Sequence, residues 1–381
     1  MKINIASSHR FHLLDLAREL ERLGHDVRFY SYVPTKRAIK FGLQQKCSYS
    51  LFYLMLPLLV LNRISKNSTW SLKIINCSLD LYMSLFMRSC DIYIAIGYVY
   101  KRSFVAARKR FGAITINDWG SKHNEEQWDI LSTIPKIKQQ SVYFKKRVID
   151  AYNFADFIAI PSDHVKQSFI DRGISSEKLI QNPYGVDLLM FRPTKLNENK
   201  AFDAIMVGSW SYVKGCDLIS TYFNNSDLTF LHVGSITDFP FPSNRNMCHI
   251  ESVDQRLLIH YYSQARIFIL PSRAEGLAMV QSQALACGLP IVCSKHTGGR
   301  DLRNFLEDKK WIIEMNDFTC DELSRCINEA LALAKTQIGF RSYAQNIENS
   351  LSWKMYGIRY DTYLNDMKRN FSNKNIYNQV L

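Results

Sequence analysis

A single acidic residue follows a buried strand in the second half of the chain, in a place where chemistry could occur. The apolar run Ala265–Leu270 predicts the strand, and the loop after it contains Glu275 followed directly by Gly276. An alanine-rich helix comes next and stops at Gly288. Free backbone N–H groups and the dipole at a helix N-terminus attract anions. A carboxylate beside such an anion site favours a ligand with both a phosphate end and a hydroxyl-rich end.

A second strand–loop–helix pattern occurs earlier in the chain. Residues 204–208 predict a strand that ends at Gly208, Ser209 opens the loop, and Lys214 with Gly215 opens a helix. A cation at such a helix start can neutralise the charge of a phosphate group. The alternative is a solvated lysine at a helix end, which is the commoner fate of a lone lysine.

The first half of the chain offers candidates in loops that follow strands. His123 ends the segment 117–123, which follows a predicted strand at 113–116. It therefore lies at the carboxyl end of a strand, the edge where doubly wound sheets bind ligands. A histidine satisfied within its own loop is the alternative. His9 and Arg10, in the loop after the first strand, are further candidates for contact with an acceptor or with phosphates.

The elements that must position these residues alternate between strands and helices. Residues 3–6 predict a strand, and residues 11–23 an amphipathic helix with apolar side chains on one face. Gly24 ends this helix at a C-cap position, and a second strand follows at 27–32. This order predicts a parallel, doubly wound sheet. Further strands are expected at 92–96, 113–116, 157–160, 204–208, 228–234 and 265–270, with helices at 104–111 and 214–223.

The same pattern restarts near residue 203, which predicts a second domain of the same kind. At 381 residues the chain is also too long for one ordinary core. The joint between the two domains is expected at 182–187, followed by the polar stretch 193–200. Two such domains face to face enclose a deep cleft between the carboxyl ends of their strands.

The segment from Glu275 to Gly288 resembles the Glu-x7-Glu motif of the retaining family 4 (group 1) glycosyltransferases. Other segments resemble further signatures of that family. They are 182–187 with 191–193 at the interdomain joint, 207–208 with 214–215 in the diphosphate-binding loop, 291–294 with 297–299 after the acid motif, and 352–353 at the start of the last helix. The resemblance is strong over residues 180–300 and weaker over residues 1–180.

The resemblance implies an α/β fold of the GT-B class. In it, two Rossmann-like doubly wound domains face each other across a cleft, and a C-terminal helix crosses back to the N-terminal domain. We expect residues 1–183, joined by 353–381, to form the acceptor-binding domain, and residues 184–352 to form the nucleotide-sugar-binding domain.

The resemblance also implies roles for particular residues. Glu275 and His123 are the catalytic candidates, both expected beside the donor sugar. The remaining expectations are Gly208, Ser209 and Lys214 at the donor diphosphate, Gly276, Leu277, Ala278 and Gln283 at the donor sugar and nucleotide, His9 and Arg10 at the acceptor or phosphates, and His164 and His296 as structural or surface residues.

Two positions depart from the family's pattern. Ser209 stands where an arginine usually follows the glycine, so one phosphate-paired charge is lost while a hydroxyl and the backbone N–H groups remain. Gln283 stands where the second acid of the motif holds the ribose hydroxyls. An amide can still bind ribose, but more weakly, because charge-assisted hydrogen bonds are the stronger ones. Alternatively, Gln283 merely packs within a helix.

The net charge of +13 comes entirely from the first part of the chain. Residues 1–150 contain 24 Lys and Arg against 11 Asp and Glu, whereas residues 151–381 contain 24 of each. Such an excess suits nucleic acid, an anionic membrane surface or an anionic substrate. No basic-aromatic motif of a nucleic-acid-binding module occurs, so we expect no nucleic acid partner.

The most apolar run of the chain, residues 49–61, lies within this basic part. It is too short to span a bilayer and contains Pro57. The basic residues that flank it are Lys36, Arg37, Lys40, Lys46, Arg63, Lys66 and Lys73. This pattern is typical of an element that lies on anionic lipid. The alternative is a core helix beside a solvated basic loop.

Several absences narrow the class of protein. No Asp-x-Asp pair occurs, and the resemblance is to metal-independent enzymes, so no metal or cofactor is expected besides the nucleotide-sugar co-substrate. The nine cysteines include no Cys-x-x-Cys pair and suit buried thiols in a reducing compartment. The chain begins with a strand-like run rather than a signal peptide. We therefore expect a cytoplasmic protein, with a peripheral position at the inner face of the cell membrane as the finer hypothesis.

The function that the resemblance implies is transfer of a sugar from a nucleotide-sugar donor to an acceptor hydroxyl, with retention at the anomeric carbon. A glycan or lipid-linked acceptor in the assembly of lipopolysaccharide, capsule or exopolysaccharide agrees with the basic and apolar N-terminal part. The alternative is a non-catalytic relative that binds a glycan or a protein, for which Ser209 and Gln283 argue. A third interpretation, an epimerase or phosphorylase on the same fold, would need catalytic acids of its own or a pyridoxal-bearing lysine in a far longer chain, and neither is found.

Overall fold

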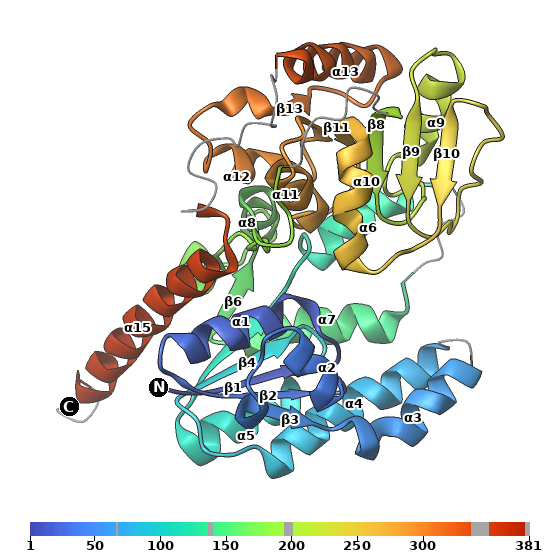
Figure 1. The fold of residues 1–381 in the computed structure, drawn as a ribbon. Helices are drawn as coiled ribbons and strands as arrows, with labels where there is room; N and C mark the ends of the chain where they lie inside the picture. The colour runs from blue at the N-terminus through green and yellow to red at the C-terminus, as the bar shows by residue number, and fades with distance from the viewer. Residues whose placement is uncertain (66–67, 136–139, 194–200, 337–349, 378–381) are drawn as a thin grey trace.

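The computed structural model describes residues 1–65, 68–135, 140–193, 201–336 and 350–377. They form two α/β domains, each built on a fully parallel sheet, that face each other (Figure 1). Lys66, most of the polar stretch 193–200 and the last four residues of the predicted returning segment lie outside the described residues.

The N-terminal sheet has seven strands in the order β3-β2-β1-β4-β5-β6-β7. The strands are β1 Lys2–Ser7, β2 Asp26–Ser31, β3 Ser48–Ser50, β4 Ile92–Ile96, β5 Ile114–Asp118, β6 Phe157–Ile160 and β7 Leu179–Gln181. The helices of this domain are α1 Phe11–Arg22, α2 Thr35–Lys40, α3 Phe52–Ile64, α4 Thr69–Phe86, α5 Lys101–Phe111, α6 Asn124–Ser132, α7 Val142–Phe154 and α8 Asp163–Ile170. The order reverses between β1 and β4, so this edge is where the fold predicts a ligand.

The C-terminal sheet has six strands in the order β10-β9-β8-β11-β12-β13. The strands are β8 Phe202–Val207, β9 Phe230–Val233, β10 Met247–Ile250, β11 Ala265–Leu270, β12 Ile291–Ser294 and β13 Ile312–Met315. The helices are α9 Cys216–Asn224, α10 Leu258–Gln264, α11 Met279–Ala286, α12 Gly299–Arg303 and α13 Cys320–Lys335. The predicted strands and helices named above are all present, with ends shifted by a few residues.

Alternation of side chains along the central strands gives the N-terminal sheet two apolar faces. Ile92 and Ile94 of β4 pack in one cluster with the leucines of α1, whereas Tyr93 packs on the opposite face with Phe104 of α5. A strand buried on both faces is typical of a parallel sheet covered by helices on each side. The predicted doubly wound architecture is confirmed.

The last helix, α15 Trp353–Tyr377, returns from the C-terminal domain to the N-terminal one and lies beside α1 (Figure 1). Gly185 in the interdomain joint packs so tightly on it that an added Cβ would lie 2.6 Å from the backbone of Trp353. Asn182 adds two hydrogen bonds, donating to the Tyr356 carbonyl (3.1 Å) and accepting from Arg359 Nε (2.8 Å). The joint and the returning helix therefore form one packed hinge region.

Candidate active site

The acid and the cation predicted from separate motifs meet in the C-terminal domain. Lys214 Nζ forms an ion pair with Glu275 Oε1, and Ser272 Oγ donates a hydrogen bond to the same oxygen at 3.0 Å. Both charged side chains are mostly, but not fully, covered. An ion pair that keeps some access to solvent can exchange partners, so a ligand phosphate can take Lys214 and a ligand hydroxyl can take Glu275.

Gly215 brings the loop that carries Lys214 against the end of β11. Its φ of +76° lies in the left-handed region, and an added Cβ would lie 2.2 Å from the Pro271 carbonyl oxygen. Arg273 fixes the same approach, because its guanidinium makes two 2.7 Å hydrogen bonds to the carboxylate of Asp217 on α9. Bidentate pairs of this kind define orientation as well as contributing energy. The Lys214–Glu275 pair therefore lies on a rigid double loop.

The N-terminal domain closes on the backbone of this acidic loop. Ser162 Oγ donates to the Gly276 carbonyl at 2.8 Å, and His164 Nε2 donates to the Glu275 carbonyl at 3.0 Å. Gly276 also abuts Gly120 so closely that an added Cβ would lie 1.7 Å from the Gly120 carbonyl oxygen. The acidic loop is thus held between the two domains.

The C-terminal half of the chain is similar in sequence to a known protein family. Residues 191–347 match the family model described as glycosyl transferases group 1. The matched residues span most of the C-terminal domain, which is therefore similar to the group 1 glycosyltransferases. No curated protein matches the chain by sequence.

Solved structures share the fold over almost the whole chain. Sucrose-phosphate synthase from Thermosynechococcus elongatus superposes with a TM-score of 0.66 at 14% identity, covering 97% of this chain and 99% of that one. Anabaena HepE in complex with UDP and glucose gives 0.62 at 14% identity, covering 96% and 99%. A glycosyltransferase from Rickettsia africae gives 0.59 at 13% identity, covering 97% and 98%. These similarities establish the GT-B fold predicted from the sequence.

His164 contacts the acidic loop, a role that the sequence interpretation did not assign to it. It was expected to be structural or on the surface, yet it reaches the Glu275 loop, and burial lowers its pKa to about 4. The imidazole is therefore neutral at physiological pH and can donate from Nε2 to the carbonyl. Ser162 and His164 directly follow β6, and their position at the carboxyl end of a strand could have indicated this role.

His123, the second catalytic candidate, lies in the core of the N-terminal domain. Its ring packs 5.1 Å from the ring of Tyr152 and 5.2 Å from that of Phe169, centroid to centroid. Its backbone N–H donates to Ser168 Oγ at 2.9 Å, and burial lowers the pKa of the ring. These are the contacts of a core histidine, and they argue against a place beside the donor sugar. The parts of this loop that face the C-terminal domain are Gly120 and Lys122.

Gln283 is buried on α11, where its side-chain carbonyl accepts a hydrogen bond from Tyr262 Oη at 3.2 Å. This contact agrees with the alternative that the residue packs. Ser209 lies partly exposed at the end of β8, beside Gly208, whose φ is +136°. Gly208 packs against Gly234: a Cβ added at Gly234 would lie 1.9 Å from the Gly208 carbonyl oxygen. The ligand-binding roles of Ser209 and Gln283 stay predictions.

The loop between β1 and α1 also reaches the C-terminal domain. Arg10 donates to Gln255 Oε1 at 2.8 Å, and His9 contacts Ser8 Oγ through Nδ1 at 2.9 Å. Phe11, which opens α1, has a φ of +34°, a conformation that side chains other than glycine rarely adopt. Strain of this kind persists only where surrounding contacts hold it. Arg10 is thereby placed at the domain interface, in agreement with its predicted contact with a ligand.

A buried hydrogen bond between a histidine and an aspartate, which the sequence interpretation missed, lies beside this loop. His12 Nε2 and Asp118 Oδ1 are 2.6 Å apart, joining the start of α1 to the end of β5. The His12 ring also lies against Tyr184 of the interdomain joint, with centroids 4.3 Å apart. The pair therefore links the ligand-facing edge of the N-terminal sheet to the hinge.

Asp301 on α12 forms another bridge between the domains. Its Oδ1 accepts from the backbone N–H of Asp163 (2.8 Å) and from Gln181 Nε2 (2.9 Å), whereas its buried Oδ2 has no partner. Burial is the main cause that raises the pKa of Asp301 to about 6. Because the folded-state pKa is raised, this group favours folding below pH 4 and loses that contribution as the pH rises through 6.

We expect Asp301→Asn to be more stable than the parent protein at pH 8, by about 1–3 kcal/mol. The amide keeps the Oδ1 acceptor and removes the buried charge. Thermal melts between pH 4 and pH 8 should show this advantage shrinking as the pH falls below 6. Asp366→Asn, at an exposed site on α15, is the control. A stability difference that does not change with pH would contradict the assignment.

Within the described residues, no group of three or more His, Cys, Asp or Glu side chains could hold a metal ion. All nine cysteines are free thiols. None of the described helices is long and apolar enough to cross a membrane.

Proposed function

We propose that this glycosyltransferase moves a sugar from a nucleotide-sugar donor to an acceptor hydroxyl, with retention at the anomeric carbon. The observation that carries the proposal is the Lys214–Glu275 pair, held on a loop enclosed between the two domains. HepE, solved in complex with UDP and with UDP-glucose, supports a uridine nucleotide as the donor carrier.

The chemistry assigned to these residues is charge stabilisation and orientation. When the bond between the anomeric carbon and the phosphate oxygen breaks, negative charge grows on the departing diphosphate. Lys214 and the N–H groups at the start of α11 stabilise that charge. Glu275 accepts hydrogen bonds from sugar hydroxyls and orients the ring. The acceptor oxygen forms its bond on the same face, and its proton passes to the departing phosphate oxygen, so no protein nucleophile is needed.

The test is transfer or hydrolysis with a panel of nucleotide sugars, followed by NMR assignment of the product's anomeric configuration. We expect activity with at least one uridine donor and a product of retained configuration. Lys214→Met should lower kcat/KM by about two to three orders of magnitude, because it removes the cation at the leaving group. Inversion, or full activity of the variant, would overturn the mechanism.

The second candidate is a non-catalytic relative that binds a glycan or a protein. The observation in its favour is Gln283, whose side-chain carbonyl is taken by Tyr262 in the core. The same panel decides between the two: turnover of any nucleotide sugar excludes the second candidate, and its absence with every donor excludes the first.

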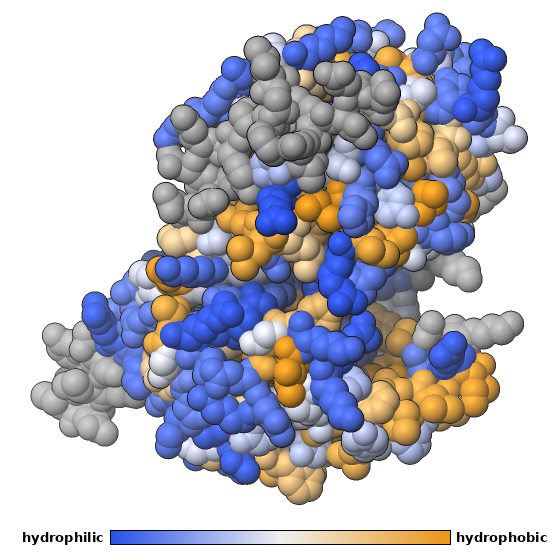
Figure 2. All heavy atoms as spheres, in the orientation of Figure 1, coloured by the Kyte–Doolittle hydropathy of each residue, from blue (hydrophilic) through white to orange (hydrophobic). Residues whose placement is uncertain are grey.

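We also propose that the acceptor is presented at an anionic membrane surface, where a lipid-linked glycan of a surface polysaccharide would be assembled. The supporting feature is the hairpin formed by α3 and α4, which carries the apolar run predicted from the sequence. Within α3 only Met55 is buried, which favours an interfacial helix over the alternative of a core helix. Tyr53, Leu54 and Ile64 are 84%, 62% and 74% exposed, and Figure 2 shows the resulting apolar patch.

The charges around this hairpin agree with an anionic lipid surface. Between residues 52 and 90 the one acidic residue, Asp80, is buried, whereas Arg63, Lys73 and Arg88 are exposed. On α4 the exposed apolar side chains include Trp70. An apolar face with cations and no exposed acid binds anionic interfaces by burial and by charge together.

Leu54→Glu combined with Ile64→Glu should weaken binding to phosphatidylglycerol vesicles at low salt by at least about tenfold, because two exposed side chains no longer enter the lipid. Vesicle co-sedimentation measures this. Ile236→Glu combined with Leu257→Glu, which changes two exposed apolar positions of the C-terminal domain, should bind like the parent protein. Parent protein that ignores the vesicles, or equal loss in both double variants, would exclude the membrane role.

A further inference from the structure

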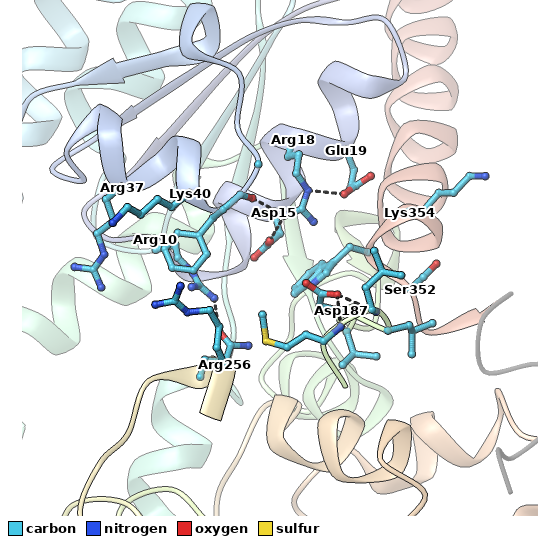
Figure 3. A pocket seen from close by; sticks show the side chains of 18 of the residues that line it. Arg10, Asp15, Arg18, Glu19, Arg37, Lys40, Asp187, Arg256, Ser352 and Lys354 are labelled. Atoms are coloured by element: carbon cyan, nitrogen blue, oxygen red, sulfur yellow. Dashed lines mark hydrogen bonds and ion pairs between the residues drawn. The ribbon is translucent and has the colours of Figure 1, made fainter. Parts of the chain in front are cut away.

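A large cationic pocket lies between the domains, outside the donor site described above. It has a volume of about 880 Å³ and is lined by α1, α2, the interdomain joint, the segment before α10 and the start of α15 (Figure 3). None of Gly208, Lys214, Glu275 or Gln283 lines it. A volume of this size accommodates a ligand of several sugar or phosphate units.

The cationic side chains that line this pocket outnumber the acidic ones. Eight cationic and four acidic side chains line it. Three of the acids are already paired: Asp15 with Arg18, Glu19 with both Arg18 and Arg22, and Asp254 with Arg256. The fourth, Asp187, accepts from the backbone N–H groups of Leu189 and Met190, both at 3.0 Å.

Five of the cations therefore form no ion pair with a described residue: Arg10, Lys36, Arg37, Lys40 and Lys354. Arg10, Arg37, Lys40 and Arg256 come from three different segments and gather at one side of the pocket (Figure 3). Burial is the main cause that lowers the pKa of Arg10; the charges of Arg37 and Arg18 lower it further, whereas those of Asp15 and Asp254 raise it. Cations that outnumber the acids in a concave site are the electrostatic signature of an anionic ligand.

Contacts with neighbouring groups hold the cationic side chains of the pocket in defined positions. The guanidinium of Arg10 lies 3.8 Å above the Phe41 ring, at the strained turn that opens α1. Arg18, beneath Gly42, is held by its two acids and by the Phe41 carbonyl at 2.9 Å. On α2, Lys36, Arg37 and Lys40 are exposed and form no ion pair with a described residue, so they stay free for a ligand.

We infer that this pocket binds phosphate groups of the acceptor, so that the acceptor is a phosphorylated glycan. The inference rests on the proposed function and adds the chemical class of its second substrate. Phosphates held at Arg10, Arg37 and Lys40 anchor the acceptor at a distance from the reacting hydroxyl. Binding energy from such a remote group can align the hydroxyl with the donor sugar.

Binding of inorganic tripolyphosphate, measured by calorimetry, tests the pocket. The triple variant Lys36→Gln, Arg37→Gln, Lys40→Gln should bind it at least about tenfold more weakly, because three charge-assisted contacts are lost. The matched control, Lys2→Gln, Lys309→Gln, Lys335→Gln, removes three exposed charges elsewhere and should bind normally. Lys214→Met should retain most tripolyphosphate binding, since that residue belongs to the other site. Equal affinity in the triple variant and its control would overturn the inference.

Activity measurements separate this inference from the proposed function. Hydrolysis of the donor by water should be unchanged in the triple variant, because its donor site is intact. In the parent protein, transfer to a dephosphorylated envelope glycan should be slower than transfer to the same glycan with its phosphates. The triple variant should transfer to both glycans at the same rate. Equal rates of the parent protein on both glycans would overturn the inference. Absence of both transfer and hydrolysis with every donor would overturn the proposed function and leave tripolyphosphate binding measurable.

Discussion

Glu275→Gln should lower kcat by about two to three orders of magnitude while leaving the affinity for UDP equal or higher. The amide keeps an oxygen that can accept from Ser272 Oγ, so the loop should retain its shape. It removes the negative charge that orients the sugar and that pairs with Lys214. Freed from this ion pair, Lys214 is more available to a diphosphate, and binding and turnover should change in opposite directions.

Steady-state kinetics and UDP titration of the same samples measure the two effects. Glu177→Gln, at an exposed site near β7, is the matched control and should behave like the parent protein. Thermal melting of both variants checks that each is folded. A folded Glu275→Gln protein with full turnover would remove the role assigned to the acid, and a parallel loss of UDP affinity would indicate that the carboxylate acts only in binding.

Gly276→Ala should reduce kcat by about two orders of magnitude, because the variant prevents the two domains from closing on the acidic loop. Its Cβ would lie 1.7 Å from the carbonyl oxygen of Gly120, and a backbone oxygen cannot move aside cheaply. The domains must then separate, which breaks the contacts of Ser162 and His164 with the acidic loop. UDP binding should stay within a few-fold of the parent value, because the predicted nucleotide contacts lie in the C-terminal domain.

Ser162→Ala is the graded control for this prediction. It deletes the 2.8 Å hydrogen bond to the Gly276 carbonyl without adding an atom, so turnover should fall only a few-fold. Small-angle scattering with and without UDP reports the separation of the domains. A Gly276→Ala protein that closes and turns over normally would show that the contact with Gly120 has no part in catalysis.

The acidic loop and the lysine loop could be predicted because their signals are local. Each consists of an apolar strand, a glycine at a defined offset and a helix start, and these determine backbone geometry within a few residues. The same applies to the alternation of strands and helices, which predicted both parallel sheets. Lys214 and Glu275 were both expected at the donor site for this reason, although their direct ion pair was not expected.

The choice between His123 and His164 illustrates what local signals lack. Both follow a strand at its carboxyl end, and sequence reasoning selected the first. In the structure, His123 turns into the aromatic core beside Tyr152, whereas His164 reaches the Glu275 carbonyl across the domain interface. The positions of the two histidines depend on how α7 and α8 pack on the sheet. This packing brings together segments that are far apart in the chain.

The sequence by itself determined the two-domain architecture, the positions of the acidic and lysine loops, and the apolar, basic character of residues 49–61. Those properties follow from periodicity, turn residues and composition, which neighbouring residues define. Only the tertiary structure decided that the apolar side chains of α3 face solvent, that His123 is buried, and that the cations of α1, α2 and α15 share one pocket. These depend on how the two sheets and the returning helix pack together, because packing brings together side chains that are distant along the chain.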